Sequence, residues 1–245
     1  MAVLALIALG LCFVSFLQDL YAYFLSSKLA PPTSARFKLS DGICQLDVDC
    51  EHNLSTWFSS SLLLLCSILL AVITSAKKKY GEPHLLYWGI LSLIFALMSV
   101  SEALPISELL TGPLRDWLTT GGLFYYAWVI PGGIFVAVFG LVYLRFIFVG
   151  LDSKFRWLFV SAGLLYVSGS LGLEMIGGLQ DELYGKSDLT YAALVTLEEF
   201  LEMLGAILFL YALMRYIGPS GSHLQVEEAL RGQKFSQANS NEQQI

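Results

Sequence analysis

The stretch TLEEFLEMLGAILFLYALMRYI, residues 196–217, puts three glutamates at the head of a segment that otherwise has the composition of a membrane span. Residues 197–217 form about 31 Å of α-helix, which is just enough to cross the hydrocarbon core of a bilayer. Charged side chains are costly at that depth and usually face a bundle interior or water. Glu198, Glu199 and Glu202 therefore need an explanation that an ordinary span does not supply.

The whole chain has the composition of an integral membrane protein. Of its 245 residues, 56% are hydrophobic and 14% are charged, whereas charged residues make up about 25% of a typical soluble domain. The net charge of −6 argues against nucleic acid as a partner, because phosphate binding needs a clustered excess of Lys and Arg. We expect the lipid bilayer as the main partner, and a homo-oligomer or a membrane-protein partner stays open.

Apolar runs long enough to cross the bilayer occur six times, at about 20 helical residues for each crossing. They cover approximately residues 2–24, 57–76, 86–104, 123–149, 157–179 and 190–217. Loops are expected at 27–55, 77–84, 111–122, 151–156 and 181–188. The first run is interpreted as a span and not a signal peptide, because it lacks a positively charged n-region. The sequence thus predicts an all-α integral membrane protein, with a six-helix bundle over residues 1–217 and a disordered polar tail over 218–245.

Basic residues near the span ends predict the orientation of this bundle. Nine of them fall on one side, namely Lys77, Lys78, Lys79, Arg145, Lys154, Arg156, Arg215, Arg231 and Lys234. Five fall on the other side, namely Lys28, Arg36, Lys38, Arg115 and Lys186. Because cytoplasmic loops carry the excess of positive charge, both termini are expected in the cytoplasm.

Glutamates from three spans are expected at one level of the membrane. Counting about 1.5 Å per residue from the cytoplasmic span ends puts Glu102, Glu174 and Glu202 about 5–10 Å inside the outer boundary. No span offers a buried Lys or Arg at that depth. Such a group of carboxylates needs either protons or a bound cation to neutralise it.

A structural interpretation of the same glutamates stays open beside the functional one. Thr196 and Glu199 fit the Ser/Thr-x-x-Glu capping box, so the last helix could begin at Thr196 with Glu198 and Glu199 in its first turn. That interpretation does not account for Glu202 or Glu174.

The first outward loop contains DGICQLDVDCEHN, residues 41–53. Cys44 and Cys50 are interpreted as a disulfide, as two free thiols or as a metal thiolate pair. Asp47, Asp49 and Glu51 alternate, which favours a solvated acidic strand over a calcium loop, because the glycine turn and distal glutamate of an EF-hand are missing. No metal ligand set is predicted.

Glycine and proline are concentrated in the fourth and fifth spans. Pro131, Gly132 and Gly133 are expected to interrupt the fourth span near its outer half. The fifth span is rich in small residues, with Ser168 and Gly172 as a small-xxx-small pair. These residues indicate either close helix packing or a broken helix that lines a cavity at the level of the acids.

Four motifs together resemble an uncharacterised family of bacterial, including cyanobacterial, multi-pass membrane proteins. They are LDVDCEHNLSTWFSSSLLLL (46–65), LMSVSEALPISELL (97–110), SGSLGLEMIGG (168–178) and the stretch at 196–217. In that family the third span usually ends in Ser-x-Asp-Glu followed by His-Glu, but here Ser101 and Ser107 replace the Asp and the His. The matched acids are Glu102, Glu108, Glu174, Glu199 and Glu202. The resemblance implies a plasma (inner) membrane protein and supplies no activity.

The sequence favours an outward-facing carboxylate site that binds a cation or relays protons, as part of a small transporter or sensor. The first alternative is a structural or assembly protein whose acids cap helices or contact partner subunits. The second is a metal-dependent intramembrane hydrolase, which is disfavoured because His52, His84 and His223 all lie outside the spans. An enzyme is not favoured, catalytic residues are unknown, and a bound cation is the one cofactor considered.

Overall fold

The computed structural model describes residues 1–28, 44–50, 53–81, 84–104 and 106–218, and these residues form helices with no strand. The long helices are α1 (Ala2–Lys28), α3 (Leu54–Tyr80), α4 (Leu85–Ala103), α6 (Val129–Gly150) and α9 (Leu189–Ile217). Between α6 and α9, the chain forms α7 (Ser153–Val167), the π-helical turn η3 (Ser168–Leu173) and α8 (Glu174–Tyr184). The short elements are α5 (Ile106–Leu118) and two 3-10 turns, η1 (Cys44–Leu46) and η2 (Gly122–Phe124).

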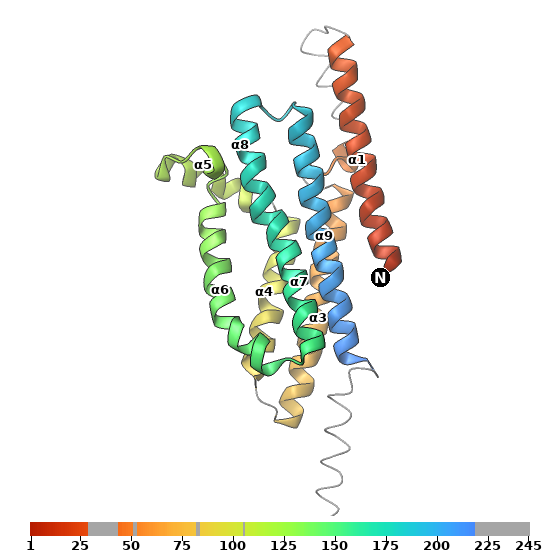
Figure 1. The fold of residues 1–245 in the computed structure, drawn as a ribbon, viewed down its shortest axis with the longest axis vertical. Coiled ribbons are helices and arrows are strands. Elements are labelled where there is room, and N and C mark those ends of the chain that lie inside the picture. The colour runs from red at the N-terminus through yellow and green to blue at the C-terminus, as the bar shows by residue number, and fades with distance from the viewer. Residues whose placement is uncertain (29–43, 51–52, 82–83, 105, 219–245) are drawn as a thin grey trace, which may run out of the picture.

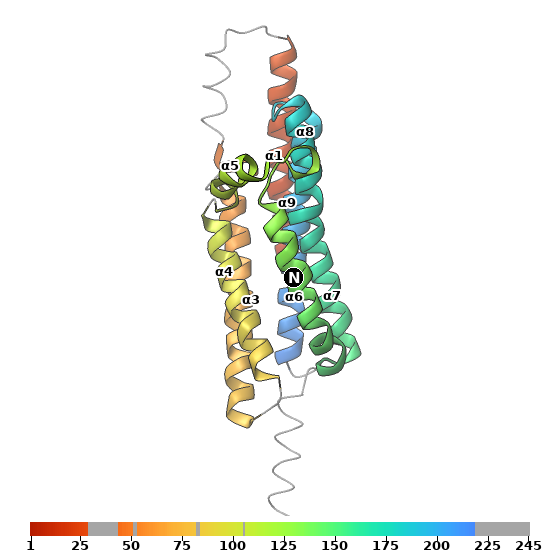
Figure 2. The same cartoon turned by 90° about the vertical axis from the view of Figure 1, so that its left-hand side faces the viewer.

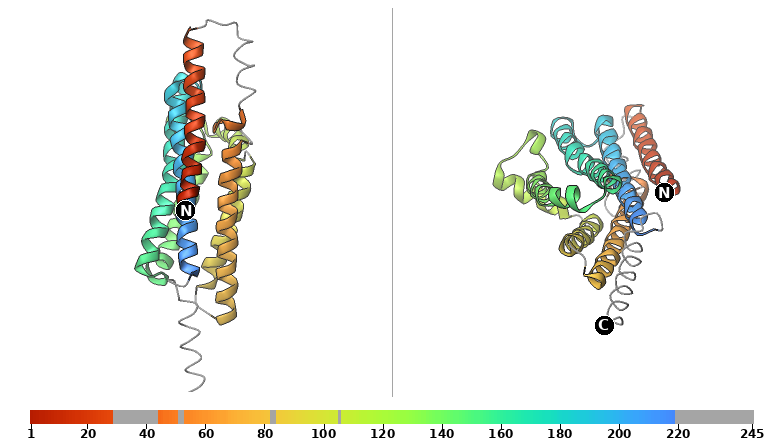
Figure 3. Two further views of the ribbon diagram at one scale, coloured as in Figure 1. Left: turned by 90° about the vertical axis from the view of Figure 1, so that its right-hand side faces the viewer. Right: turned by 60° about the horizontal axis from the view of Figure 1, so that its bottom comes forward.

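These helices run roughly along one axis, except for α5 (Figures 1 and 2). We call the end of the bundle where α4 ends and α9 begins the upper end. The α3–α4 hairpin forms one side, α9 lies in the middle, and α1 runs along the outer flank of α9 and reaches beyond the other helices (Figure 3). α9 contacts α1, α3, α7, η3 and α8, and it is the helix around which the others are arranged.

Among the described residues, five helical segments are long and apolar enough to cross a membrane: Ala2–Phe24, Leu54–Lys79, Leu85–Ala103, Val129–Gly150 and Ser153–Tyr184. The predicted all-helical architecture with several membrane-type helices is therefore confirmed. The predicted sixth span corresponds to α9, which is not one of these five segments. Most of the buried side chains of α9 lie in its second half, where Met203, Leu213 and Tyr216 face the core.

Some predicted boundaries were wrong. The loop expected at 111–122 is largely helical, because α5 continues to Leu118 with Pro113 inside it. Apolar residues at helical spacing in α5 outweighed the turn signal of Gly112 and Pro113. The fourth span begins at Val129 and not at 123, so Pro131 lies in the first turn of α6, where its missing N–H costs nothing. The expected interruption of α6 is thus a helix start.

The helical segment that corresponds to the span expected at 157–179 is also longer than predicted. α7 begins at Ser153 and α8 continues to Tyr184, so helix replaces parts of the loops expected at 151–156 and 181–188. The break in regular helix geometry occurs here, at η3, and not at Pro131. This π-helical turn lies beside α9.

Reciprocal serine hydrogen bonds join α3 to α4. Ser60 Oγ donates to Ser99 O at 2.9 Å, and Ser99 Oγ donates to Ser60 O at 2.9 Å. The same exchange occurs one heptad further along, where Ser67 Oγ donates to Ser92 O at 2.8 Å and Ser92 Oγ to Ser67 O at 2.9 Å. Small residues with hydroxyl groups allow close helix approach in an apolar solvent, so these four bonds fix the register of the hairpin.

An aromatic cluster closes the lower end of the bundle. Trp88 and Phe146 are almost fully buried and meet edge to face, with ring centroids 5.4 Å apart. Phe159 and Tyr216 also contact the Trp88 ring. Four helices are thereby joined at this level, and the upper half is left with more space.

We expect the double replacement of Ser67 and Ser92 by Ala to lower the free energy of unfolding by about 1 kcal/mol, because interhelical hydrogen bonds in membranes contribute about 0.6 kcal/mol each on average. Unfolding by sodium dodecyl sulfate in mixed micelles measures this change. The matched control is Ser61→Ala, since Ser61 Oγ donates within α3 to Trp57 O. A double variant no less stable than this control would show that the serine pairs do not hold the hairpin.

Candidate functional site

α9 begins at Leu189, seven residues before Thr196, so the capping box at Thr196 does not form the start of this helix. Asp188 is the N-cap residue, and its carboxylate accepts a hydrogen bond from Thr190 N at 3.0 Å. Gln180 Nε2 donates to the same carboxylate at 2.8 Å, and these hydrogen bonds lower the pKa of Asp188. Thr196 Oγ1 instead bonds to Ala192 O within the helix. The interpretation of Glu198 and Glu199 as first-turn residues was therefore wrong: Glu198 lies about 13 Å along the helix.

Five glutamates of the described residues line one cavity of about 780 Å³, which extends from the upper end of the bundle to Phe146 and Phe159 of the aromatic cluster. Glu102 reaches it from the last turn of α4, and Glu174 reaches it from the start of α8. Glu198, Glu199 and Glu202 reach it from α9. Four helical elements, α4, α6, α7–η3–α8 and α9, form most of its wall. Acids that are up to 100 residues apart in the sequence thus share one space.

Two glycines allow α7 and η3 to approach α9 closely. A Cβ atom on Gly169, in η3, would lie 2.8 Å from Glu198 O and 3.0 Å from Glu202 Cγ. A Cβ atom on Gly205, in α9, would lie 2.7 Å from Tyr166 N and 2.9 Å from Ala162 O. Such distances leave no room for a side chain. The close approach puts Tyr166 and Glu174 against the acidic face of α9.

Each carboxyl group in the cavity has a different environment. Glu174 lies close to Glu198, and Trp128 Nε1 donates to Glu174 Oε1 at 2.8 Å. The phenol of Tyr166 lies close to the carboxyl group of Glu202. Glu199 Oε2 is buried and has no hydrogen-bond partner. Ionised carboxylates are acceptors only, so two neighbouring carboxyl groups such as Glu174 and Glu198 can hydrogen-bond to one another only when they share a proton.

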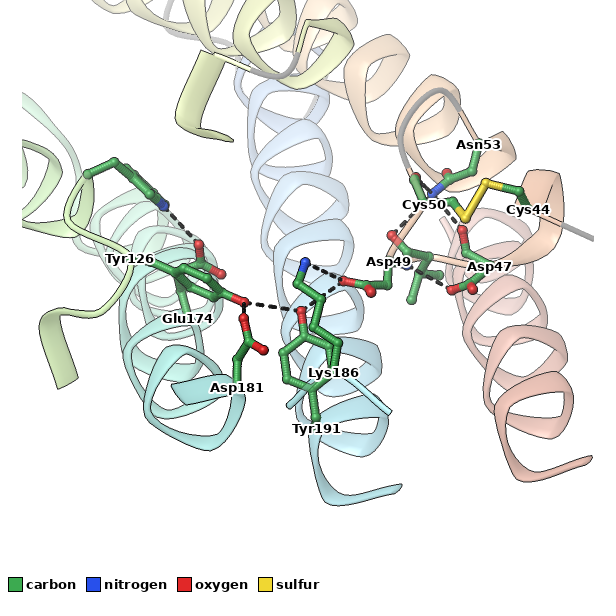
Figure 4. A network of polar contacts seen from close by, with 12 residues as sticks. Cys44, Asp47, Asp49, Cys50, Asn53, Tyr126, Glu174, Asp181, Lys186 and Tyr191 are labelled. Atoms are coloured by element: carbon green, nitrogen blue, oxygen red, sulfur yellow. Dashed lines mark hydrogen bonds and ion pairs between the residues drawn. A yellow bond between two sulfur atoms is a disulfide. The ribbon is translucent and has the colours of Figure 1, made fainter. Parts of the chain in front are cut away.

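A chain of polar side chains crosses the upper end of the cavity (Figure 4). Tyr126 Oη donates to Asp181 Oδ2 at 2.8 Å and lies 3.3 Å from Tyr191 Oη. Tyr191 Oη donates to Asp49 Oδ1 at 2.9 Å, and Lys186 Nζ lies 3.9 Å from the same oxygen. Burial raises the pKa of Asp49, although Lys186 and Tyr191 act in the opposite direction. Burial also raises the pKa of the Tyr126 phenol.

The loop that precedes α3 is held in place by Asn53. Its Nδ2 donates to Asp47 O, Val48 O and Cys50 O, while its Oδ1 caps α3 by accepting from Thr56 N at 2.7 Å. Cys44 and Cys50 form a disulfide within this loop. The expected acidic strand is wrong, because Cys44–Leu46 is a 3-10 turn and Asp47–Asp49 continue into a turn. The carbonyl groups of the loop are therefore hydrogen-bonded by the Asn53 side chain and not by a neighbouring strand.

Two acids of this loop, Asp47 and Asp49, lie within the described residues. Asp47 Oδ1 accepts from Asp49 N at 3.0 Å, and burial raises the pKa of Asp47. Both line a second cavity of about 120 Å³, together with Asp19 from α1, Lys186 and Tyr191. Glu51 lies outside the described residues. Glu108 belongs to α5, but its side chain is also outside the described part of the chain.

The carboxylates are spread over the cavity wall and do not gather around one point. In the described ranges, no three His, Cys, Asp or Glu side chains are grouped so that they could hold a metal ion. The arrangement can therefore hold and pass protons, or face a ligand larger than a single metal ion.

Sequence reasoning missed several polar partners of the acids, namely Asp19, Tyr126, Trp128, Tyr166, Asp181 and Tyr191. Tyr166 and Trp128 were hidden because aromatic residues are common in spans and at their ends, and their polar tips find partners on other helices. Lys186 was counted as a topological charge and not as a neighbour of Asp49.

A protein-family model described as a domain of unknown function (DUF8692) matches residues 1–217. No curated protein and no solved structure matches the chain.

We expect Gly169→Ala to lower the free energy of unfolding by about 1–3 kcal/mol, the usual cost of overpacking a close helix contact. Its Cβ would meet the backbone of α9, which cannot turn aside as a flexible side chain does. Gly172→Ala is the matched control, since it lies in the same π-helical turn and its Cβ would meet nothing within 4 Å. Unfolding in mixed micelles compares the stabilities of the two variants. Equal stabilities would mean that the structure accommodates a Cβ atom at Gly169 without loss.

Proposed function

The chain belongs to the DUF8692 family of unknown function, and we propose that it is a six-span membrane protein whose buried glutamates hold protons and exchange them for a cation. In this proposal the protein resides in the plasma (inner) membrane of a bacterium and is part of a small transporter or sensor. The observation that carries the proposal is the position of five described glutamates on the wall of one cavity, with Glu174 close to Glu198.

The charge balance of the cavity supports this exchange. Its described lining includes six acids, which are Asp49 and the five glutamates, but Lys186 is the single Lys or Arg among them. Lys186 lies near Asp49 at the upper end, so it does not neutralise the glutamates below. Several ionised carboxylates at such short range in a low-dielectric interior repel one another strongly. Protons or a cation must supply the missing positive charge, and the two therefore compete for one set of oxygens.

Helix packing supports the six-span topology. α9 is long enough to cross the bilayer, and α1, α3, α7 and α8 surround it, so its glutamates are shielded from lipid. α5 lies across the upper end and exposes Leu109 and Trp117, as an interfacial helix does (Figure 1). With the excess of basic residues on the lower side, the cavity faces outward and the termini lie in the cytoplasm.

Cysteine labelling tests this topology. Ser187→Cys, between α8 and α9, should react with a membrane-impermeant maleimide in intact cells, whereas Lys154→Cys, at the start of α7, should react after the membrane is opened. Both positions are exposed, and the native Cys12 and Cys66 are buried, which keeps the background low. The reverse pattern would invert the orientation, and equal labelling of both would contradict the span count.

Infrared spectroscopy tests the protons. At neutral pH we expect the carboxylic-acid C=O band in the wild type, and we expect Glu198→Gln to lose a part of it because the shared proton has one carboxylate fewer to bridge. Sodium, calcium or tetramethylammonium chloride added to weakly buffered protein should release protons from the wild type. Glu198→Gln and Glu202→Gln should reduce this release at least several-fold.

The matched control is Asp116→Asn, an exposed acid of α5 that does not line the cavity. It should leave both the band and the proton release as they are in the wild type. A protein without any protonated carboxyl group at neutral pH, and without cation-dependent proton release, does not perform the proposed exchange.

A further inference from the structure

We propose that the cation of this cavity is the head of a cationic amphiphile, with its ammonium group among the glutamates and its apolar chain between the aromatic residues below them. This inference rests on the proposed function, because it names the class of ligand for the same carboxylates. It differs from that function in requiring a chain as well as a charge.

The size of the cavity favours an organic ligand. Its volume of about 780 Å³ lies within the range of about 300–1,000 Å³ that is usual for small-molecule sites. A lone metal ion needs several oxygens around one point, and in the described part of the chain no three acidic, His or Cys side chains are so grouped. A bulky ammonium group, in contrast, can contact carboxylates that stand apart.

The lining changes from polar to apolar along two helices in the same direction. On α4 it passes from Glu102 through Met98 and Phe95 to Leu91, about 16 Å along the axis. On α9 it passes from Glu202 to Phe209, whose ring stacks on Phe95 with centroids 4.5 Å apart. The wall contributed by α6 and α7 adds Phe135, Phe139 and Phe159. One end of the cavity suits a charge and the other a hydrocarbon chain.

Aromatic side chains accompany the carboxylates at the polar end. Trp128, Tyr126 and Tyr166 line the cavity there. Trp128 and Tyr126 hydrogen-bond to acids through their polar tips, and the Tyr166 phenol lies close to Glu202. Aromatic faces beside acidic groups are the recognised surroundings of quaternary ammonium groups, which bind by cation–π attraction. The buried and unpartnered Glu199 Oε2 supplies an oxygen that no protein group satisfies. A ligand cation satisfies it without a hydrogen bond.

The helices that flank the cavity suggest a route from the bilayer. α4 and α6 meet through ring contacts of Tyr87 and Trp88 with Tyr143 and Phe146, near the start of α4 and the end of α6. The glutamates and most of the aromatic lining lie above these contacts. An amphiphile already dissolved in the membrane would therefore reach the cavity between the upper halves of α4 and α6.

Calorimetric titration of the full chain in nanodiscs of uncharged lipid, with empty nanodiscs subtracted, tests the inference. The probes are dodecyltrimethylammonium, tetramethylammonium and dodecanol, which separate the contributions of charge and chain. We expect the wild type to bind dodecyltrimethylammonium at least tenfold more tightly than either of the other two. Glu199→Gln should remove most of the advantage over dodecanol.

Two glycines of the α7–η3 segment give a matched pair of variants. Gly163 lines the cavity and a Cβ there would meet nothing within 4 Å, so Gly163→Leu should fold and fill the space of the chain. Gly172 also has open space around it but does not line the cavity, so Gly172→Leu is the control. We expect Gly163→Leu to lose at least tenfold in affinity for dodecyltrimethylammonium, and Gly172→Leu to retain it.

Equal affinity of the wild type for the two ammonium probes, or for dodecyltrimethylammonium and dodecanol, would overturn the inference. If protons are nevertheless released by sodium, calcium or tetramethylammonium, the proposed exchange stands and the chain-binding inference alone fails. If neither the infrared band nor any proton release is found, both fail together.

Discussion

The close approach of α7 and η3 to α9 is the contact on which the arrangement of this protein depends. Gly169 and Gly205 face one another's helices with no room for a Cβ atom, and this lets backbone meet backbone in a region where side chains normally set the spacing. Glu174 is brought close to Glu198, and Tyr166 close to Glu202. Without this contact the acids would face separate surroundings.

Several carboxyl groups on the wall of one cavity need protons or positive charge, and the described lining residues include only one Lys and no Arg. Trp128 donates a hydrogen bond to one acid, Tyr166 lies close to another, and Lys186 lies near Asp49 at the upper end. In the proposed function, protons or a bound cation balance the remaining negative charge. The same residues would then both hold protons and bind the cation, so the two would be coupled.

Part of this arrangement was predictable from the sequence. Apolar runs identified the long helices, and counting residues from their ends predicted that Glu102, Glu174 and Glu202 share a level; all three line one cavity in the structure. The apolar run expected at 190–217 lies within α9, whereas the Thr196 capping box pointed to the wrong helix start, because Asp188 offers the same capping chemistry eight residues earlier. The partners Trp128 and Tyr166 were missed because each forms its polar contact across helices, which leaves no periodic signal. The loop at 44–50 was misjudged because Asn53, and not strand pairing, satisfies its carbonyl groups.

The serine pairs of α3 and α4 have a mechanical consequence. Because Ser60 and Ser67 are one heptad apart and bond to Ser99 and Ser92 in the same reciprocal manner, sliding one helix along the other by a single turn would break all four bonds at once. The hairpin is therefore one stiff unit. Because Ser55 and Cys66 of α3 also donate to Met203 Sδ and Ala206 O of α9, its register fixes the height of Glu102 relative to the glutamates of α9.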